Sequence, residues 1–281
     1  MAVRVRCITD PACVWSWAFE PVVRALMVEF GEDLEWTFVM GGLAREYGPD
    51  DHGPMTQHWL EASDESGMPT DPLAWSEAPL ASTYPACKAV KAAQKQGRVA
   101  AYRYLRALRE GIVCRRRKLD TTEALVEEAR AVGLDVDRFR RDLSSKAIAK
   151  AFEADLDESR DVPQVARNVG KVRCSADVGE ERVPFPTLHF TGEDGTARWT
   201  CGMRPYGFVR EAALAAGSRP SEVPRPTVLD ALRRFGTMAS VELAAVCDLP
   251  LPRVEADLSA LALDSRIAST SVLAGRLWEP A

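Results

Sequence analysis

The sequence has no cysteine pair in C-x-x-C spacing, although it contains seven cysteines in 281 residues. It has only three histidines, at positions 52, 58 and 189, and none lies beside a cysteine pair, so the usual zinc ligands are missing. An odd number of scattered cysteines argues against a disulfide framework and favours free thiols in a reducing compartment. The sequence therefore predicts neither a bound metal nor an ordinary dithiol redox pair.

Long apolar runs and excess positive charge are also missing. No run approaches the ~18 apolar residues of a membrane span, and MAVRVRCITD has strand-like alternation in place of a signal-peptide core. The net charge of -5 gives no general attraction to nucleic acid or to an anionic membrane. We therefore expect a globular protein of the cytoplasm that does not associate with membranes.

The first forty residues have the pattern of a β-α-β unit. Residues 3–8 alternate between apolar and charged side chains, as in a half-buried strand. Pro11 interrupts that strand, and residues 15–31 form an amphipathic helical pattern that ends at Gly31. Residues 34–42 have the composition of a second strand, which predicts a parallel strand pair.

Helical patterns then dominate, and strands return late in the chain. Residues 48–79 are rich in Pro, Gly, Asp and Ser, and we expect them to cover a site as a lid. Helical periodicity continues to about residue 170, and residues 184–190 and 197–201 form a predicted hairpin before a last helix. This order predicts an α/β thioredoxin fold with an all-helical insertion at about 48–170.

The chain is predicted to divide after this fold. Residues 1–217 would form the thioredoxin-like domain, and the polar, proline-rich residues 218–226 would form a linker. Residues 227–281 have the pattern of three helices and a small hairpin, which is the order of a winged helix-turn-helix. The predicted second part is therefore a small winged-helix-like domain.

Charge argues against DNA binding by that domain. From residue 221 to the end there are six arginines, no lysine and eight acidic residues. The helix LPRVEADLSAL carries Glu255 and Asp257 against Arg253, whereas a groove-reading helix needs cationic contacts to phosphate. We expect dimerisation, docking to a protein partner or packing over the first domain.

Cys13 is the main candidate for chemistry. It lies after a strand and at the start of a helix, where the helix dipole favours the thiolate and predicts a lowered thiol pKa. The alternative is a small buried apolar cysteine. Ser16 occupies the place of a second redox cysteine, so the intramolecular release of a mixed disulfide is lost. Its hydroxyl could bind the thiolate or cap the helix.

Three segments carry a family resemblance: DPACVWSWAFE at 10–20, YPACKAVKAAQKQG at 84–97 and FPTL at 185–188. Over residues 3–216 the chain resembles the DsbA-type thioredoxin-fold family, in particular its cytosolic branch of FrnE-like oxidoreductases and SpxH (YjbH) adaptors of the Clp protease. The resemblance implies that Cys13 is the nucleophile and Pro186 the cis-proline. Ser16 departs from the C-x-x-C that is commoner in the family.

The same resemblance suggests binding residues. If Pro186 is cis and not an ordinary trans proline, Phe185 and the adjoining Thr187 would lie beside Cys13, where an extended peptide or a thiol cofactor could pair with the backbone. Tyr84 and Cys87 begin a helix that faces the groove in DsbA-like folds. Cys87 is then either a second thiol or a packed helix cysteine.

Further candidates depend on the predicted lid. Trp15, Trp17, Trp59 and Trp75 would form an aromatic wall if the lid covers the site, or would pack in the core. The basic run at 115–118 could hold the carboxylate of a thiol cofactor or an acidic partner, or could be a solvated helix end.

Three functions fit these observations. The first is monothiol exchange or thiol-dependent transfer at Cys13, with mycothiol or glutathione, or a protein thiol, as the second thiol. The second is a noncatalytic adaptor that binds a protein through the groove and the C-terminal domain, with a homodimer as a further option. The third follows from a resemblance to kappa-class glutathione transferases and hydroxychromene carboxylate isomerases, and is thiol-assisted isomerisation or transfer of a small organic molecule.

Overall fold

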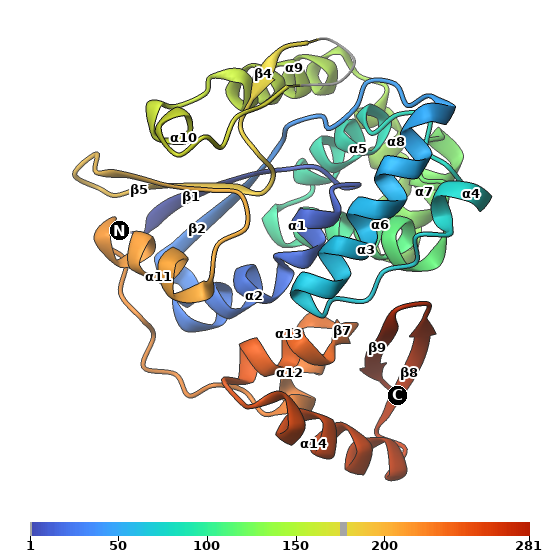
Figure 1. Cartoon of the computed structure of the whole chain (residues 1–281), viewed down its shortest axis with the longest axis vertical. Coiled ribbons are helices and arrows are strands. Elements are labelled where there is room, and N and C mark those ends of the chain that lie inside the picture. The colour runs from blue at the N-terminus through green and yellow to red at the C-terminus, as the bar shows by residue number, and fades with distance from the viewer. Residues whose placement is uncertain (1, 175–178) are drawn as a thin grey trace.

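A four-stranded mixed sheet forms the centre of the computed structural model, which describes residues 2–174 and 179–281 (Figure 1). The strand order is β2-β1-β5-β6. β1 runs parallel to β2, whereas β5 is antiparallel to both β1 and β6. This topology confirms the predicted thioredoxin fold, with strands β1 (Val3–Thr9), β2 (Leu34–Met40), β5 (Thr187–Thr191) and β6 (Ala197–Cys201).

The predicted helix between the parallel strands is in fact two helices, α1 (Val14–Ala18) and α2 (Glu20–Glu29). They are separated at Phe19, and Pro21 lies in the first turn of α2, where its missing N–H costs no hydrogen bond. Gly31, at φ +53°, then turns the chain through the short helix η1 (Gly31–Asp33) into β2.

The elements of the predicted insertion are all helices, joined by short loops. Its first part, expected to be a loop-rich lid with one helix, contains three helical elements, and a hydrogen bond from Asp71 N to Val113 O ties it to the rest of the insertion. The elements are η2 (Pro49–Asp51), α3 (His52–Ser66), α4 (Ala74–Glu77), α5 (Tyr84–Gln94), α6 (Arg98–Arg115), α7 (Thr122–Ala131), α8 (Val136–Leu143), α9 (Lys146–Arg160) and α10 (Gln164–Asn168).

Two small elements return the chain from the insertion to the sheet, and a last helix completes this part. The two-stranded ladder of β3 (Arg173–Cys174) and β4 (Glu181–Arg182) carries no alternation long enough to predict it. After β6 comes the predicted last helix, α11 (Tyr206–Ala215), with Pro205 at its N-cap.

The C-terminal residues form three helices and a hairpin, as the sequence predicted. Figure 1 shows this C-terminal module below α2. A short strand adds to the hairpin in the order β7-β9-β8, and a small apolar core separates the sheet from the helices. The elements are α12 (Val228–Phe235), β7 (Met238–Ala239), α13 (Ser240–Cys247), α14 (Leu251–Leu263), β8 (Ile267–Val272) and β9 (Gly275–Pro280).

The segment that joins the two parts lies along α2. Ser221 N donates to Glu29 O at 2.6 Å, and the Arg225 guanidinium binds the Glu29 carboxylate at 2.7 Å. α13 packs against α2 on the same side of the molecule. The module is thus held against the thioredoxin-like part along the length of the segment.

A buried ionic cluster reinforces that contact. Arg106 makes a bidentate pair with Glu242, with both N···O distances at 2.8 Å, and Arg24 approaches the same carboxylate at 3.2 Å. Charge is balanced within the cluster, which joins α2, α6 and α13. We call this set the ionic cluster; its members are Glu20, Arg24, Arg106, Arg109, Glu110 and Glu242.

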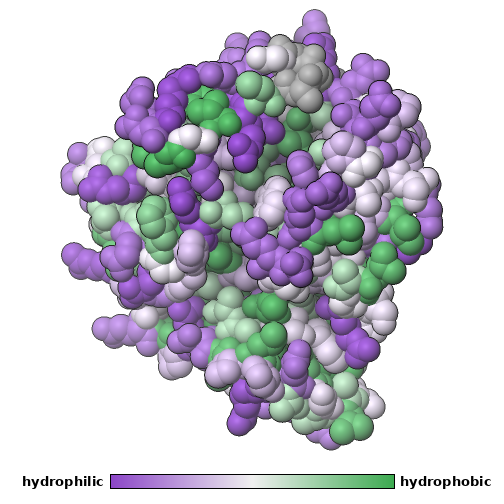
Figure 2. Space-filling view, viewed as in Figure 1, coloured by the Kyte–Doolittle hydropathy of each residue, from purple (hydrophilic) through white to green (hydrophobic). Residues whose placement is uncertain are grey.

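Polar and charged side chains are spread over the face shown in Figure 2, with hydrophobic side chains in small groups between them. Within residues 2–174 and 179–281, no helix is long and apolar enough to cross a membrane. The same residues contain no group of three or more His, Cys, Asp or Glu side chains that could hold a metal ion.

Candidate functional site

Cys13 lies just beyond the carboxyl end of β1, at the N-cap of α1. Its N–H donates to Asp10 O at 3.2 Å, and its carbonyl accepts from Ser16 N and Trp17 N at 3.0 and 3.1 Å. The short turn between the strand and the helix therefore fixes the position of the thiol. Ser16 lies one turn further along α1, as the spacing predicted.

The thiol of Cys13 is buried, with 5% of the residue exposed. Burial raises its pKa, although the nearby Ser16 hydroxyl and N–H and the charge of Arg182 oppose the rise. The predicted lowering of the pKa is therefore wrong in this structure. α1 has only five residues, so its dipole is small beside the cost of removing a thiolate from water.

Phe185 covers the thiol. The Phe185–Pro186 peptide bond is cis, and Phe185 O lies 3.9 Å from Cys13 Sγ. The phenyl ring packs on the backbone of Gly41, where an added Cβ would lie 2.1 Å from the ring Cζ. Thr187 is also buried, and its hydroxyl donates to Pro184 O at 2.7 Å. The predicted segment therefore reaches Cys13, but it packs over the thiol.

A buried carboxylate connects Cys13 to the insertion. Asp10 accepts hydrogen bonds from Ala12 N at 2.8 Å, Leu43 N at 2.6 Å, Thr83 Oγ1 at 2.8 Å and Cys87 Sγ at 3.2 Å. Burial raises the pKa of Asp10 and of the Cys87 thiol, while the four donors limit the rise at Asp10. Asp10 lies three residues before Cys13 in the chain. The structure places Cys87 beside Asp10, where its thiol donates a hydrogen bond to the carboxylate.

Three polar atoms near Cys13 have no hydrogen-bond partner among the described residues: Ser16 Oγ, Tyr47 OH and Arg182 Nε. Arg182 is buried, its guanidinium lies 4.2 Å from the centre of the Phe185 ring, and its charge lowers the pKa of Cys13. Burial lowers the pKa of Arg182 itself. Sequence reasoning missed Tyr47, Arg182 and Asp10, and only Asp10, next to the cysteine turn, could have been suspected.

The predicted aromatic wall is mostly core. Trp17 is fully buried, donates its indole N–H to Pro69 O at 2.9 Å and packs under Arg106 in the large core. Trp59 and Trp75 pack edge to face, 5.6 Å apart. Trp15, which is half-buried, contacts both the large core and the apolar cluster around Cys13.

Two other predicted binding elements are engaged within the protein. The Tyr84 ring packs edge to face on Phe152, and its hydroxyl accepts from Arg160 at 3.5 Å. Each member of the basic run at 115–118 is paired with a carboxylate, supplied by Glu110, Asp71 with Glu77, Glu128 and Asp120 in turn.

Two cavities lie away from the thiol. One between Trp59 and Trp75 measures about 10 Å³, which is the room of a single water molecule. A second, of about 1260 Å³, lies between α6, β2 and the C-terminal module, and Cys13 does not line it. The predicted lid segment therefore encloses no substrate-sized space in the cavity beside its tryptophans.

This fold, with a cysteine after β1 and a cis-proline segment across from it, matches a known family. Residues 7–165, more than half of the chain, match the family model described as Thioredoxin, and the chain belongs to the thioredoxin family. Within that family the chain is similar to the ClpXP adapter protein SpxH of Halalkalibacterium halodurans, at 28% identity, and of Bacillus subtilis, at 27% identity. Each match covers 96% of this chain and 86% of the relative.

Solved structures show the same fold. The cytosolic disulfide reductase DsbM from Pseudomonas aeruginosa superposes with a TM-score of 0.56 at 17% identity, covering 75% of this chain and 95% of that one. The structure of DsbM with GSH superposes with a TM-score of 0.53 at 18% identity. The DsbA-like resemblance that the three sequence segments suggested is thereby confirmed.

Proposed function

We propose that the chain is a protein-binding adaptor of the ClpXP type. One observation carries this proposal: the Cys13 thiol is buried and its pKa is raised, and Ser16 stands where a resolving thiol would be. A thiol in that state contains little thiolate near neutral pH, and the thiolate is the nucleophile in disulfide exchange. The arrangement therefore favours binding over thiol chemistry.

The length over which the chain aligns with the SpxH relatives supports the same proposal. The SpxH relatives align over 96% of the chain, so the alignment extends through the C-terminal module as well as the thioredoxin-like part. In this chain the ionic cluster holds the two parts together. A rigid pair of modules can present one composite surface to a protein partner, which costs little ordering on binding.

A trapping experiment tests the adaptor proposal. Host cells would carry a proteolytically inactive ClpP, and the proteins retained inside it would be identified by mass spectrometry. We expect a set of proteins that is captured with the wild-type chain, captured equally with Cys13→Ser, and lost when the gene is deleted. An unchanged set after deletion would refute the adaptor function, and loss of the set in Cys13→Ser would show that the thiol is needed.

A second candidate is monothiol exchange at Cys13. The unpartnered atoms of Ser16, Tyr47 and Arg182 favour it, because buried polar groups without partners are uncommon away from functional sites. In this reaction the Cys13 thiolate attacks a disulfide, the attacked S–S bond breaks, and one sulfur leaves as a thiolate. A second thiol, such as glutathione or mycothiol, then attacks the mixed disulfide and regenerates Cys13.

Mass spectrometry of the protein as isolated tests the exchange reaction. A thiol adduct on Cys13 that is absent from Cys87 and is removed by a reductant would support it. A free Cys13 that forms no adduct with glutathione disulfide or mycothiol disulfide would exclude it. Isomerisation of an organic substrate gains no support, since the cavity beside Trp59 and Trp75 is about 10 Å³.

A further inference from the structure

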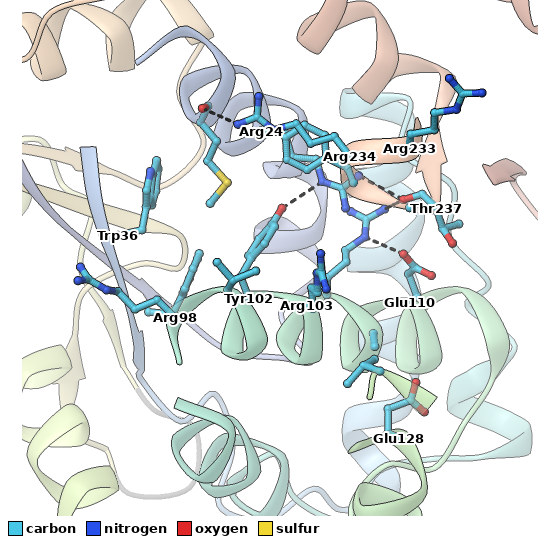
Figure 3. A pocket seen from close by; sticks show the side chains of 18 of the residues that line it. Arg24, Trp36, Arg98, Tyr102, Arg103, Glu110, Glu128, Arg233, Arg234 and Thr237 are labelled. Atoms are coloured by element: carbon cyan, nitrogen blue, oxygen red, sulfur yellow. Dashed lines mark hydrogen bonds and ion pairs between the residues drawn. The ribbon is translucent and has the colours of Figure 1, made fainter. Parts of the chain in front are cut away.

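The cavity of about 1260 Å³ is an open groove between the two parts of the chain (Figure 3). α6 and β2 form one side, and residues 233–237 of the C-terminal module form the other. We call this space the arginine groove. It exists only because the C-terminal module lies against α2 and α6.

The charge of the groove is opposite to that of the chain. Eight arginines and four glutamates line it, without lysine or aspartate, so the lining carries 8 minus 4, or +4, while the whole chain carries -5. The arginines are Arg24, Arg98, Arg103, Arg106, Arg115, Arg117, Arg233 and Arg234, and the glutamates are Glu32, Glu35, Glu110 and Glu128.

Six of these arginines lie within ion-pair distance of a carboxylate, and two, Arg103 and Arg234, have no such partner among the described residues. Arg24 and Arg106 bind Glu242, and Arg98, Arg115 and Arg117 bind Glu35, Glu110 and Glu128. Among the described residues, Arg103 has no carboxylate partner. Within the described ranges, Arg234 contacts Met27 O and the Phe235 ring, while Arg233 pairs with Asp230 at 3.7 Å. The uncompensated positive charge therefore lies on both walls of the groove.

Aromatic side chains lie between these charges. Trp36, Phe38 and Tyr102 form a continuous stack, with ring centroids 6.1 and 5.4 Å apart, and Phe235 faces them from the other wall. The indole N–H of Trp36 is buried and has no hydrogen-bond acceptor among the described residues. The groove thus offers apolar, aromatic surface between its charged side chains.

The groove also runs along the outer edge of the sheet, where one residue has free main-chain groups. β2 is the outermost strand of the sheet, and its even-numbered residues direct their main-chain groups away from β1: Phe38 O accepts from Gln94 at 2.7 Å, and Met40 N donates to Asp155 at 2.8 Å. Trp36 has the same orientation, but within the described ranges its outward groups meet no partner. A single extended chain could pair with them.

We propose that the arginine groove binds an extended acidic peptide segment of a protein partner. The segment adds beside β2 at Trp36, places apolar or aromatic side chains on Tyr102 and Phe235, and pairs its carboxylates with Arg103 and Arg234. The proposal rests on the adaptor function, and it assigns the chemistry of the segment that the adaptor would recognise.

The lining favours a peptide over a nucleic acid. Four glutamates interrupt the positive charge, and a continuous phosphate backbone would meet them at close range. A peptide can space its carboxylates to fit the free arginines. It can also use the outward N–H and C=O of Trp36, which an extended backbone matches in both donor and acceptor.

The test uses the full-length chain and a fluorescein-labelled peptide of about eight residues that alternates Glu or Asp with Phe, Tyr or Leu. Fluorescence anisotropy would report binding. We expect Arg103→Glu/Arg234→Glu to weaken binding by roughly tenfold or more, because two uncompensated cations become anions. Arg198→Glu/Arg219→Glu makes the same charge change at exposed arginines outside the groove and should leave binding unchanged. A peptide with Gln and Asn in place of the acids should not bind.

Two results would overturn the proposal: no binding of the acidic peptide, or equal weakening by both double variants. Tighter binding of a single-stranded oligonucleotide, lost in Arg103→Glu/Arg234→Glu, would assign the groove to nucleic acid instead. The ClpP trap separates this failure from failure of the adaptor function. If deletion of the gene empties the trap but Arg103→Glu/Arg234→Glu does not, the adaptor function stands and the groove is not its client site.

Discussion

The Cys13 site and the arginine groove are built on the same sheet but differ in almost every physical respect. At Cys13, the thiol, Phe185, Asp10 and Cys87 are all buried, and the polar atoms are enclosed in apolar surroundings. The groove is open and carries a net positive lining, with Arg103 exposed on its wall. The thioredoxin-like part has the geometry of a cysteine site, but that site is closed. The accessible site is the arginine groove, which lies where the C-terminal module joins the thioredoxin-like part.

The two regions differ because of what packs against each of them. Phe185 can close over Cys13 because Gly41 has no side chain and its backbone accepts the ring. In the groove, the arginines beside the ionic cluster are charged. Burying them further would remove their remaining hydration, at a large cost in free energy. Charge therefore keeps the groove open, while apolar packing closes the cysteine site.

The largest effect is expected from Glu242→Leu, which would break the joint that forms the groove. Glu242 is fully buried and binds both Arg106 and Arg24, so its loss leaves two buried guanidinium groups short of a partner. We expect the free energy of unfolding to fall by about 3–5 kcal/mol, and peptide binding in the groove to be lost. Urea denaturation followed by tryptophan fluorescence would measure the change.

Glu255→Leu is the matched control for this joint. Glu255 is exposed on α14, and surface substitutions usually change stability by less than about 0.5 kcal/mol. If Glu242→Leu is as stable as Glu255→Leu, then the ionic cluster does not hold the two parts together. Arg106→Met/Glu242→Leu should recover part of the loss, because it removes charges from both sides of the pair.

A smaller effect is expected at Gly41, where a side chain would reopen the cysteine site. In Gly41→Ala the new Cβ would clash with the Phe185 ring, so Phe185, whose carbonyl lies 3.9 Å from Cys13 Sγ, must shift. We expect a loss of about 1–3 kcal/mol and faster alkylation of Cys13 by iodoacetamide. Peptide-level mass spectrometry would separate Cys13 from the exposed Cys174.

Gly53→Ala controls for the substitution itself. Gly53 lies in α3 with no atom within 4 Å of an added Cβ, so alanine there should leave stability unchanged or raise it by up to about 1 kcal/mol. Cys13 should be alkylated at the wild-type rate in this variant. An unchanged alkylation rate in Gly41→Ala would mean that Phe185 does not limit access to the thiol.

The sequence was sufficient for the fold but not for the state of the site. Alternation in residues 3–8 and helical periodicity in the insertion are local signals, and they predicted β1 and the helices α5 to α9 closely. The position of Cys13 also followed from local order. The pKa of the Cys13 thiol could not be predicted in this way. Phe185 and Arg182 come from far along the chain, and the burial of the thiol depends on how they pack.

The ionic cluster and the groove were beyond sequence reasoning for a similar reason. Glu20, Arg106 and Glu242 are separated by more than eighty residues at each step, and no spacing rule relates such positions. The basic run at 115–118 was a predicted binding site for a carboxylate, yet its members are paired with nearby carboxylates of the protein itself. Arg103 and Arg234, which lie outside that run, are the lining arginines without carboxylate partners among the described residues.

The smallest effect is expected from Arg182→Met, which tests whether the closed site still serves the thiolate. The charge of Arg182 lowers the pKa of Cys13, so its removal should raise that pKa further. The rate of Cys13 alkylation would then rise at a higher pH than in the wild type. Methionine keeps most of the apolar contact with Phe185. Arg173→Met, at an exposed position, should leave the pH profile unchanged.

The direction of that shift separates a structural arginine from one that acts on the thiol. If Arg182 only fills space over Phe185, methionine should preserve the alkylation profile, and the unpartnered Nε would be a tolerated packing defect. If the profile moves to higher pH, a buried cation stabilises the Cys13 thiolate despite the burial that opposes it. The cysteine site would then retain one element of thiol chemistry beside a groove built for binding.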